Sequence, residues 1–166
     1  MDLIKKLSGV VMDVVHVYTN KDPPKPGDMI QSQMPGFQHW GIYVGSEDEG
    51  VHGDVIHFAL PAVSYFPPKF QVRRQKVKDI EWAHRSAVNN KFDHIYPALP
   101  PDRIVKRAKH MEDKIMKYDS GSANCEHFAT LMRYDIARSE QANRFGFNVD
   151  LDFVKEVKGW LAEIGE

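Results

Sequence analysis

The feature that most constrains this fold is a change of sequence pattern near residue 100. Before it, four segments rich in aromatic and β-branched residues are separated by Gly- and Pro-containing connections, which is typical of β-strands. These segments are residues 29–34, 39–45, 54–59 and 70–80. After it, apolar residues recur every three or four positions in three segments, which predicts helices. These segments are residues 103–117, 125–138 and 154–164. Strands followed by helices indicate the α+β class.

Two terminal segments flank this pattern. In residues 1–20 apolar side chains recur at helical spacing, and the Pro- and Gly-containing stretch 21–27 then breaks any regular element. We therefore divide the chain into an N-terminal helical extension (1–24), a central domain (25–143) and a C-terminal amphipathic helix (144–166). We expect the apolar faces of the terminal segments to pack on the domain itself; contact with a membrane surface or a protein partner is the alternative.

Composition excludes several classes of protein. The 22 Lys and Arg residues nearly balance the 23 Asp and Glu residues, so we expect no nucleic-acid partner. A length of 166 residues fits one domain, and no stretch of about 20 mostly apolar residues predicts a membrane span. The single cysteine excludes an internal disulfide and a multi-cysteine zinc site. An unpaired thiol fits a reducing compartment, so we expect a cytoplasmic protein, with a peripheral position on membranes as the alternative.

Cys125 is the candidate nucleophile. It follows the polar loop 120–124 and opens a predicted helix. The unpaired backbone N–H groups and the positive dipole at a helix start stabilise a thiolate, so both are expected to lower the pKa of this thiol. The alternative is that Cys125 is a small buried side chain without a chemical role.

His39 and His57 are the candidate partners of Cys125, because both lie in predicted strands between apolar neighbours. Adjacent strands would place the two imidazoles side by side, as a base and its orienting group in a Cys/His/His site. Each could instead be a hydrogen-bonded core histidine, or the three side chains could hold zinc. His127 lies two residues from Cys125, which on a helix turns it about 200° away. We therefore expect His127 to pack elsewhere.

Four blocks of the sequence resemble one known family. They are Lys25-Pro-Gly-Asp-Met-Ile30, Gly36-Phe-Gln-His-Trp-Gly-Ile-Tyr-Val-Gly45, Val55-Ile-His-Phe-Ala59 and Asn124-Cys-Glu-His-Phe128. In this order they are similar to the motifs of the LRAT-like acyltransferases, which include the small phospholipase A/acyltransferases, also called HRAS-like suppressors. The resemblance covers residues 25–143.

The resemblance implies a circularly permuted papain-like/NlpC-type fold, in which an antiparallel sheet packs against helices. It assigns Cys125 as nucleophile, His39 as base and His57 as orienting residue, and it requires no cofactor and no metal. Two departures concern the surroundings of the site. Phe37 stands where several small members have Tyr, and the tail 150–166 is charged and amphipathic where cellular members have a hydrophobic anchor.

The implied activity is that of a thiol-dependent phospholipase A/acyltransferase. Such an enzyme cleaves a glycerophospholipid ester through a thioester acyl-enzyme, with water or an amine as acceptor. Its expected partners are a phospholipid substrate and a membrane surface. Some picornavirus nonstructural proteins carry similar motifs, so the alternative is a catalytically silent interaction protein on the same scaffold, which binds host proteins or membranes.

Overall fold

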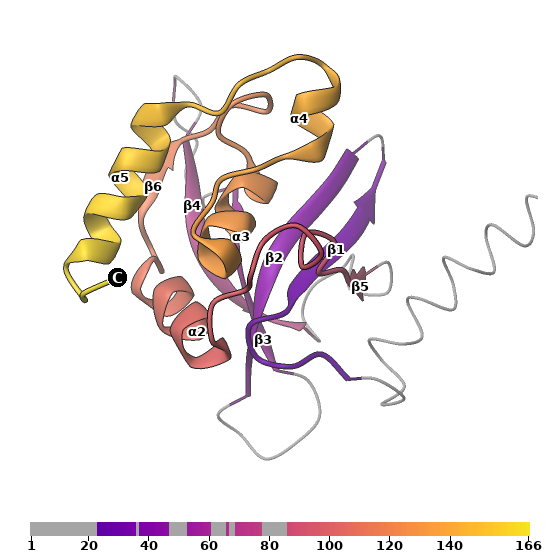
Figure 1. The fold of residues 1–166 in the computed structure, drawn as a ribbon, viewed down its shortest axis with the longest axis vertical. Coiled ribbons are helices and arrows are strands. Elements are labelled where there is room, and N and C mark those ends of the chain that lie inside the picture. The colour runs from indigo at the N-terminus through magenta and orange to yellow at the C-terminus, as the bar shows by residue number, and fades with distance from the viewer. Residues whose placement is uncertain (1–22, 36, 47–52, 61–65, 67–68, 78–85) are drawn as a thin grey trace, which may run out of the picture.

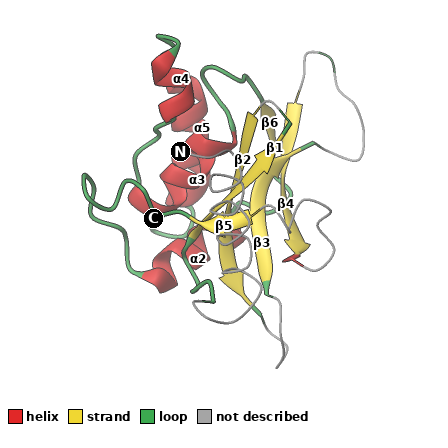
Figure 2. Ribbon diagram, turned by 90° about the vertical axis from the view of Figure 1, so that its right-hand side faces the viewer, coloured by secondary structure: helices red, strands yellow, loops and turns green. Residues whose placement is uncertain are grey.

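The computed structural model describes residues 23–35, 37–46, 53–60, 66, 69–77 and 86–166. The predicted N-terminal helix in residues 1–20 lies outside them. The described chain forms a six-stranded sheet in the order β5-β1-β2-β3-β4-β6, in which every pairing is antiparallel. The helices all lie on one side of this sheet (Figures 1 and 2). The α+β class and the antiparallel sheet are therefore confirmed.

The strands and helices have the following bounds. The strands are β1 (Met29–Met34), β2 (Phe37–Gly45), β3 (Asp54–Ala59), β4 (Lys69–Lys76), β5 (Ser86–Val88) and β6 (Ile115–Lys117). The helices are α2 (Pro101–His110), α3 (Cys125–Tyr134), α4 (Glu140–Arg144) and α5 (Leu151–Ala162). In the described part of the chain, no helix is long and apolar enough to cross a membrane.

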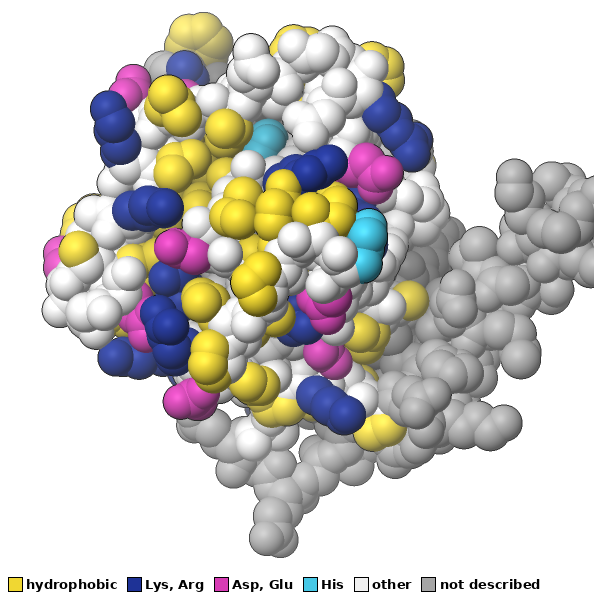
Figure 3. All heavy atoms as spheres, in the orientation of Figure 1, with side chains coloured by type: hydrophobic (Ala, Val, Ile, Leu, Met, Phe, Trp, Pro, Cys, Tyr) yellow, Lys and Arg dark blue, Asp and Glu magenta, His cyan; other side chains and the backbone are white. Residues whose placement is uncertain are grey.

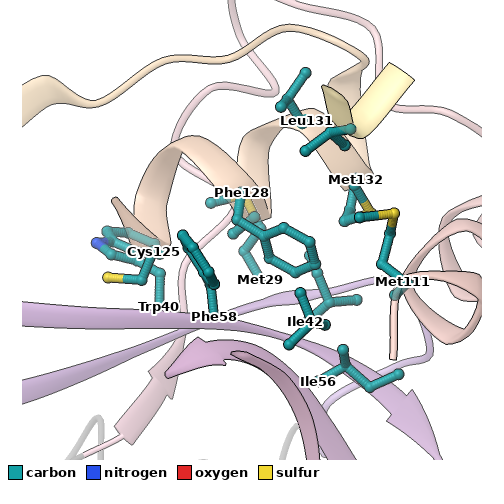
Figure 4. Close-up of a cluster of buried hydrophobic side chains, with 14 of the residues drawn as sticks. Met29, Trp40, Ile42, Ile56, Phe58, Met111, Cys125, Phe128, Leu131 and Met132 are labelled. Carbon is teal, nitrogen blue, oxygen red and sulfur yellow. The ribbon is translucent and has the colours of Figure 1, made fainter. Parts of the chain in front are cut away.

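The main core lies between the sheet and the helices. Successive strand residues point to opposite faces, so even-numbered residues of β2 and β3, such as Trp40 and Phe58, face α3. There they pack against Phe128 and other buried side chains of that helix (Figure 4). His39 and His57 are odd-numbered residues of the same strands, so they belong to the opposite set of side chains.

The C-terminal helix α5 belongs to the same core. Phe153, Val157 and Leu161 recur at helical spacing and are at most 4% exposed. The Phe153 ring stacks on Phe58 with a centroid separation of 5.8 Å. The apolar face of α5 therefore packs on the domain itself, as the sequence predicts, and is not free to lie on a membrane.

The predicted helix over 103–117 is wrong in its second half. α2 ends at His110, and Asp113 adopts a left-handed backbone conformation with φ 69°, which a continuing helix excludes. Residues 115–117 instead form β6, which pairs with β4 and turns Met116 into the core. The sheet edge thus replaces the helical turns that the spacing indicated.

The helix predicted over 125–138 is also shorter in the structure. α3 ends at Tyr134, because Asp135 caps it in the left-handed conformation with φ 59°. A further short helix, α4, follows. It begins after Ser139, whose hydroxyl accepts a hydrogen bond from the Ala142 backbone N–H at 3.2 Å. The sequence analysis did not predict α4.

Candidate active site

Cys125 is the first residue of α3, and the residue before it caps the helix. The Asn124 side-chain oxygen accepts a hydrogen bond from the His127 backbone N–H at 3.0 Å, and His127 Nδ1 accepts one from the Asn124 backbone N–H at 3.2 Å. This reciprocal capping fixes where the helix starts. It also engages the His127 ring at the cap, so the structure does not place His127 as a partner of Cys125.

His39 and His57 are brought together across the β2–β3 pair. His39 Nε2 lies 2.6 Å from His57 Nδ1, and the two rings meet edge to face. Gly41 makes the close approach of the strands possible, because it is the cross-strand partner of His57. A Cβ at Gly41 would lie 2.5 Å from Val55 Cγ1 and 3.2 Å from His57 Cβ.

Gln75 extends this pair to a third strand. His57 Nε2 lies 2.5 Å from Gln75 Oε1 on β4, so the hydrogen-bonded chain runs from β2 through β3 to β4. The sequence analysis missed Gln75. The position of Gln75 follows from the β3–β4 register. His57 pairs with Arg73, and Gln75 lies two residues after Arg73, so its side chain is on the same face of the sheet.

The orientation of the Gln75 amide fixes the direction of this chain. Because an amide oxygen only accepts, His57 Nε2 must carry the hydrogen that it donates to Gln75. His57 Nδ1 then has only a lone pair, and it accepts a hydrogen bond from the Nε2–H of His39. A neutral His39 carries one ring hydrogen, so its other nitrogen, Nδ1, is an acceptor in this tautomer.

Cys125 lies against the backbone of β2 on both sides of His39. Its Sγ is 3.9 Å from the Gln38 carbonyl oxygen, and the backbone N–H of Trp40 is directed at the sulfur. Figure 4 shows the Cys125 side chain next to Trp40 at the start of α3. Cys125 thus contacts the β2 backbone at the residues on either side of His39, whose ring pairs with His57.

Cys125 can reach the backbone of β2 because the β2–β3 pairing ends before Trp40. The N–H and C=O groups of Tyr43 bond to Asp28 and Gly27 on the β1 side. Backbone groups alternate in direction along a strand, so those of Gln38 and Trp40 point to the β3 side. The ladder with β3 starts only at Gly41. The backbone of Gln38 and Trp40 lies past its end, where the Cys125 side chain reaches it.

Burial dominates the protonation of all three side chains. Desolvation raises the pKa of the Cys125 thiol to about 12, although the backbone N–H groups of Trp40 and Glu126 act in the opposite direction. Burial also lowers the pKa of His39 to about 3 and that of His57 to about 4. The thiol is thus protonated and both rings are neutral at pH 7. The expectation of a lowered thiol pKa is wrong here, because the loss of water outweighs the helix start.

A cavity of about 390 Å³ opens on Cys125. Its walls include several aromatic side chains, and three of these are well exposed at its mouth. They are Phe37, Phe145 and Phe147, which are 49%, 73% and 54% exposed. Phe147 packs directly on Gly121, where a Cβ would come within 2.8 Å of its ring. Figure 3 shows hydrophobic side chains at the upper edge of the molecule, where α4 and the following loop lie.

The described residues offer no metal site. No three His, Cys, Asp or Glu side chains among them come together in a way that could hold a metal ion. The zinc alternative for Cys125, His39 and His57 therefore finds no support in this geometry.

Comparison with known proteins identifies related sequences. A family model described as lecithin retinol acyltransferase matches residues 22–138. Phospholipase A and acyltransferase 1 of Homo sapiens is 40% identical over 151 residues, which cover 86% of this chain and 85% of that protein. Human phospholipase A and acyltransferase 3 is 36% identical over 128 residues, covering 71% and 75%. Human phospholipase A and acyltransferase 4 is 35% identical over 131 residues, covering 73% and 76%.

Proposed function

The chain belongs to the lecithin retinol acyltransferase family, and we propose that it is a thiol-dependent phospholipase A/acyltransferase. The observation that carries the proposal is the hydrogen-bonded chain Gln75–His57–His39, together with the contact of Cys125 with the backbone on either side of His39. In this proposal Cys125 is the nucleophile, His39 the base and His57 the group that orients the base. The substrate is a glycerophospholipid ester.

The first step forms an acyl-enzyme. His39 Nδ1 removes the thiol proton of Cys125 while the sulfur attacks the carbonyl carbon of the ester. The tetrahedral intermediate then collapses, the C–O bond breaks, and the leaving alkoxide takes the proton from His39. The products are a lysophospholipid and a thioester on Cys125.

The second step removes the acyl group. Water, or the amine of an acceptor lipid, gives a proton to His39 and attacks the thioester. Attack by water releases a fatty acid, whereas attack by an amine releases an N-acylated product. In both cases the thiolate leaves and regains the proton, so Cys125 and His39 return to their starting state.

Backbone N–H groups are suited to stabilise the oxyanion in both steps. Those of Cys125, Glu126 and Trp40 are directed at the Cys125 sulfur. A carbonyl carbon bonded to this sulfur would place its oxygen close to the same donors. Fixed N–H donors that face developing negative charge commonly supply about 2.7–4 kcal/mol each.

Proton transfer and attack occur together in this mechanism. With a thiol pKa of about 12 and a His39 pKa of about 3, a thiolate–imidazolium pair would not accumulate before substrate binds. The proton therefore moves as the carbon–sulfur bond forms. This differs from cysteine enzymes that keep a thiolate at rest.

We also propose that the fold is a circularly permuted papain-like one, with residues 25–143 as its catalytic unit. The order of the site residues supports this. In papain-like enzymes the cysteine lies near the N-terminus and the histidine follows far downstream. Here His39 and His57 precede Cys125, and the strands precede the cysteine helix.

A catalytically silent interaction protein is the second candidate. The observation that favours it is the state of Cys125, which is 6% exposed and has a raised pKa. A structural cysteine shares both properties. The two candidates differ in what happens when Cys125 is replaced.

The test is hydrolysis of phosphatidylcholine vesicles by the purified full chain. The proposal predicts fatty-acid release that is abolished by Cys125→Ala and by His39→Ala. His94→Ala is the matched control for the histidine, because His94 is exposed and outside the cavity; it should retain full activity. No turnover by either wild type or Cys125→Ala with phospholipids in micelles and vesicles would favour the interaction protein, and equal turnover by both would contradict Cys125 as nucleophile.

A further inference from the structure

A second cavity of about 400 Å³ lies beside the one that holds Cys125. The two cavities share part of their walls. The shared residues are Phe37, Gln38, Gln141 and Phe145. A ligand whose reacting ester is at Cys125 and whose next functional group is a few bonds away would therefore extend into the second cavity.

The second cavity is much more polar than the first. Amide side chains supply part of its wall, and three charged side chains supply another part. The amides outside the shared wall are Gln31, Gln33 and Asn89, and the charged residues are Lys91, Glu140 and Arg144. With two cations and one carboxylate, the charged lining carries a formal charge of +1. Lys91 is balanced by Glu126 and Glu140, so Arg144 is the more loosely held cation of this wall; an arginine beside amide side chains suits an anionic oxygen ligand.

The two cations of this lining differ in how tightly they are held. The Lys91 Nζ lies 2.9 Å from both Glu126 and Glu140, and 4.6 Å from the centre of the Trp40 ring. Glu126 is itself buried, so Lys91 is anchored in the wall. Arg144 is different, because its side chain is 75% exposed and its contact with Glu140 is 3.6 Å long. Its guanidinium can turn towards a ligand at little cost.

We propose that this second cavity binds the phosphodiester of the glycerophospholipid whose ester reacts at Cys125. The inference rests on the proposed function and adds where the headgroup lies. The Arg144 guanidinium donates to two phosphate oxygens at once, a geometry that arginine favours. The Lys91 ammonium and the glutamine amides complete the polar wall. The glycerol crosses the shared wall between Phe37 and Phe145, and the acyl chain stays on the aromatic side.

The test compares two soluble esters, one with and one without the phosphate. The substrates are dihexanoyl phosphatidylcholine and p-nitrophenyl hexanoate. Arg144→Gln should raise KM for the phospholipid about 10-fold, as expected for loss of a charge-assisted hydrogen bond, and leave kcat nearly unchanged. KM for p-nitrophenyl hexanoate should not change. Arg103→Gln is the matched control, because Arg103 is a partly exposed arginine on α2 outside both cavities.

A binding experiment keeps the inference testable apart from catalysis. Glycerophosphocholine, added to the inactive Cys125→Ala chain, should shift the side-chain amide signals of Gln33 and Gln141 in nuclear magnetic resonance spectra. Arg144→Glu should abolish these shifts, and glycerol alone should not produce them. If inorganic phosphate produced the same shifts with the same affinity as glycerophosphocholine, the cavity would be a general phosphate site and the headgroup assignment would be overturned.

The outcomes separate the two proposals. If wild type hydrolyses neither ester but binds glycerophosphocholine through Arg144, the proposed function fails and the binding site stands. If both esters are hydrolysed and Arg144→Gln changes the two KM values equally or not at all, the proposed function stands and the headgroup site is wrong.

Discussion

The Oε1 atom of Gln75 lies 2.5 Å from Nε2 of His57, on the side of the ring opposite to His39. With the Gln75 oxygen facing His57, this contact favours a hydrogen on Nε2 of His57 and, in turn, on Nε2 of His39. In the proposed mechanism this tautomer makes Nδ1 of His39 the base. We therefore propose that Gln75 is a positioning residue for His39, two hydrogen bonds away from it.

Replacement of Gln75 tests this role. Gln75→Leu removes the acceptor, so both tautomers of His57 become possible, and we expect kcat to fall about 100-fold. Gln75→Glu keeps an acceptor at the same place and should retain most activity. The added carboxylate also favours protonated His57, so the acid limb of the kcat–pH profile should move to higher pH. A merely structural role would lower activity in both variants without moving the profile.

The reactivity of Cys125 follows from its raised pKa. Because the pKa is about 12, the thiolate fraction and the rate of iodoacetamide alkylation should rise about tenfold per pH unit up to pH 10, without a plateau. The urea-unfolded chain is the control, and its rate should level off near the ordinary thiol pKa of 9.0. A plateau below pH 8 in the folded protein would mean that the thiol is activated at rest.

The buried histidines predict a loss of stability in acid. His39 and His57 have folded-state pKa values of about 3 and about 4, below the ordinary value of 6.5. Between pH 6.5 and 4 the unfolded chain binds protons that the folded chain does not, so the free energy of unfolding falls as pH falls. Urea unfolding at pH 7.5, 6.0 and 5.0 measures this slope.

His57→Gln should make this slope shallower, since it removes one of three buried histidines whose pKa is lowered; the third, His127, also has a pKa of about 4. His94→Gln should leave the slope as it is in wild type if the buried histidines are responsible, because His94 is exposed. Stability that does not change between pH 7.5 and 5.0 would contradict neutral burial of the two rings.

The aromatic mouth of the cavity predicts a dependence on lipid surfaces. Phe145→Ser should lower activity on vesicles about 10-fold, because burying one Phe side chain contributes about 1.5–3 kcal/mol. Activity on dihexanoyl phosphatidylcholine below its micelle concentration should change much less. Phe66→Ser is the matched control, since Phe66 is 99% exposed but does not line the cavity. Equal losses on both forms of substrate would mean that Phe145 contacts only the bound molecule.

Local patterns predicted much of this fold. The four predicted strand segments correspond to β1, β2, β3 and β4, because aromatic and β-branched residues mark them directly. The pattern over 103–117 failed at Asp113, whose positive φ the apolar spacing does not reveal. Residues 115–117 form a strand there because pairing with β4 satisfies the hydrogen-bonding groups of their backbone. This tertiary contact outweighs the local helical spacing.

The sequence predicted those parts of the candidate site that depend on local patterns, and missed those that depend on tertiary contacts. His39 and His57 could be paired from adjacent strands, but Gln75 depends on the register between β3 and β4, which no local pattern specifies. The helix start at Cys125 was also visible in the sequence. The thiol pKa was not, because burial by β2 and the cavity walls determines it, and these are tertiary contacts.

The most direct test of the central claim is the intact mass of the protein after brief mixing with dihexanoyl phosphatidylcholine and quenching in acid. The account predicts a hexanoyl adduct on Cys125 that hydroxylamine removes, and its absence in Cys125→Ala. His57→Gln should form the same adduct more slowly. Fatty-acid release without any adduct, or an adduct that persists in Cys125→Ala, would contradict a thioester mechanism at Cys125.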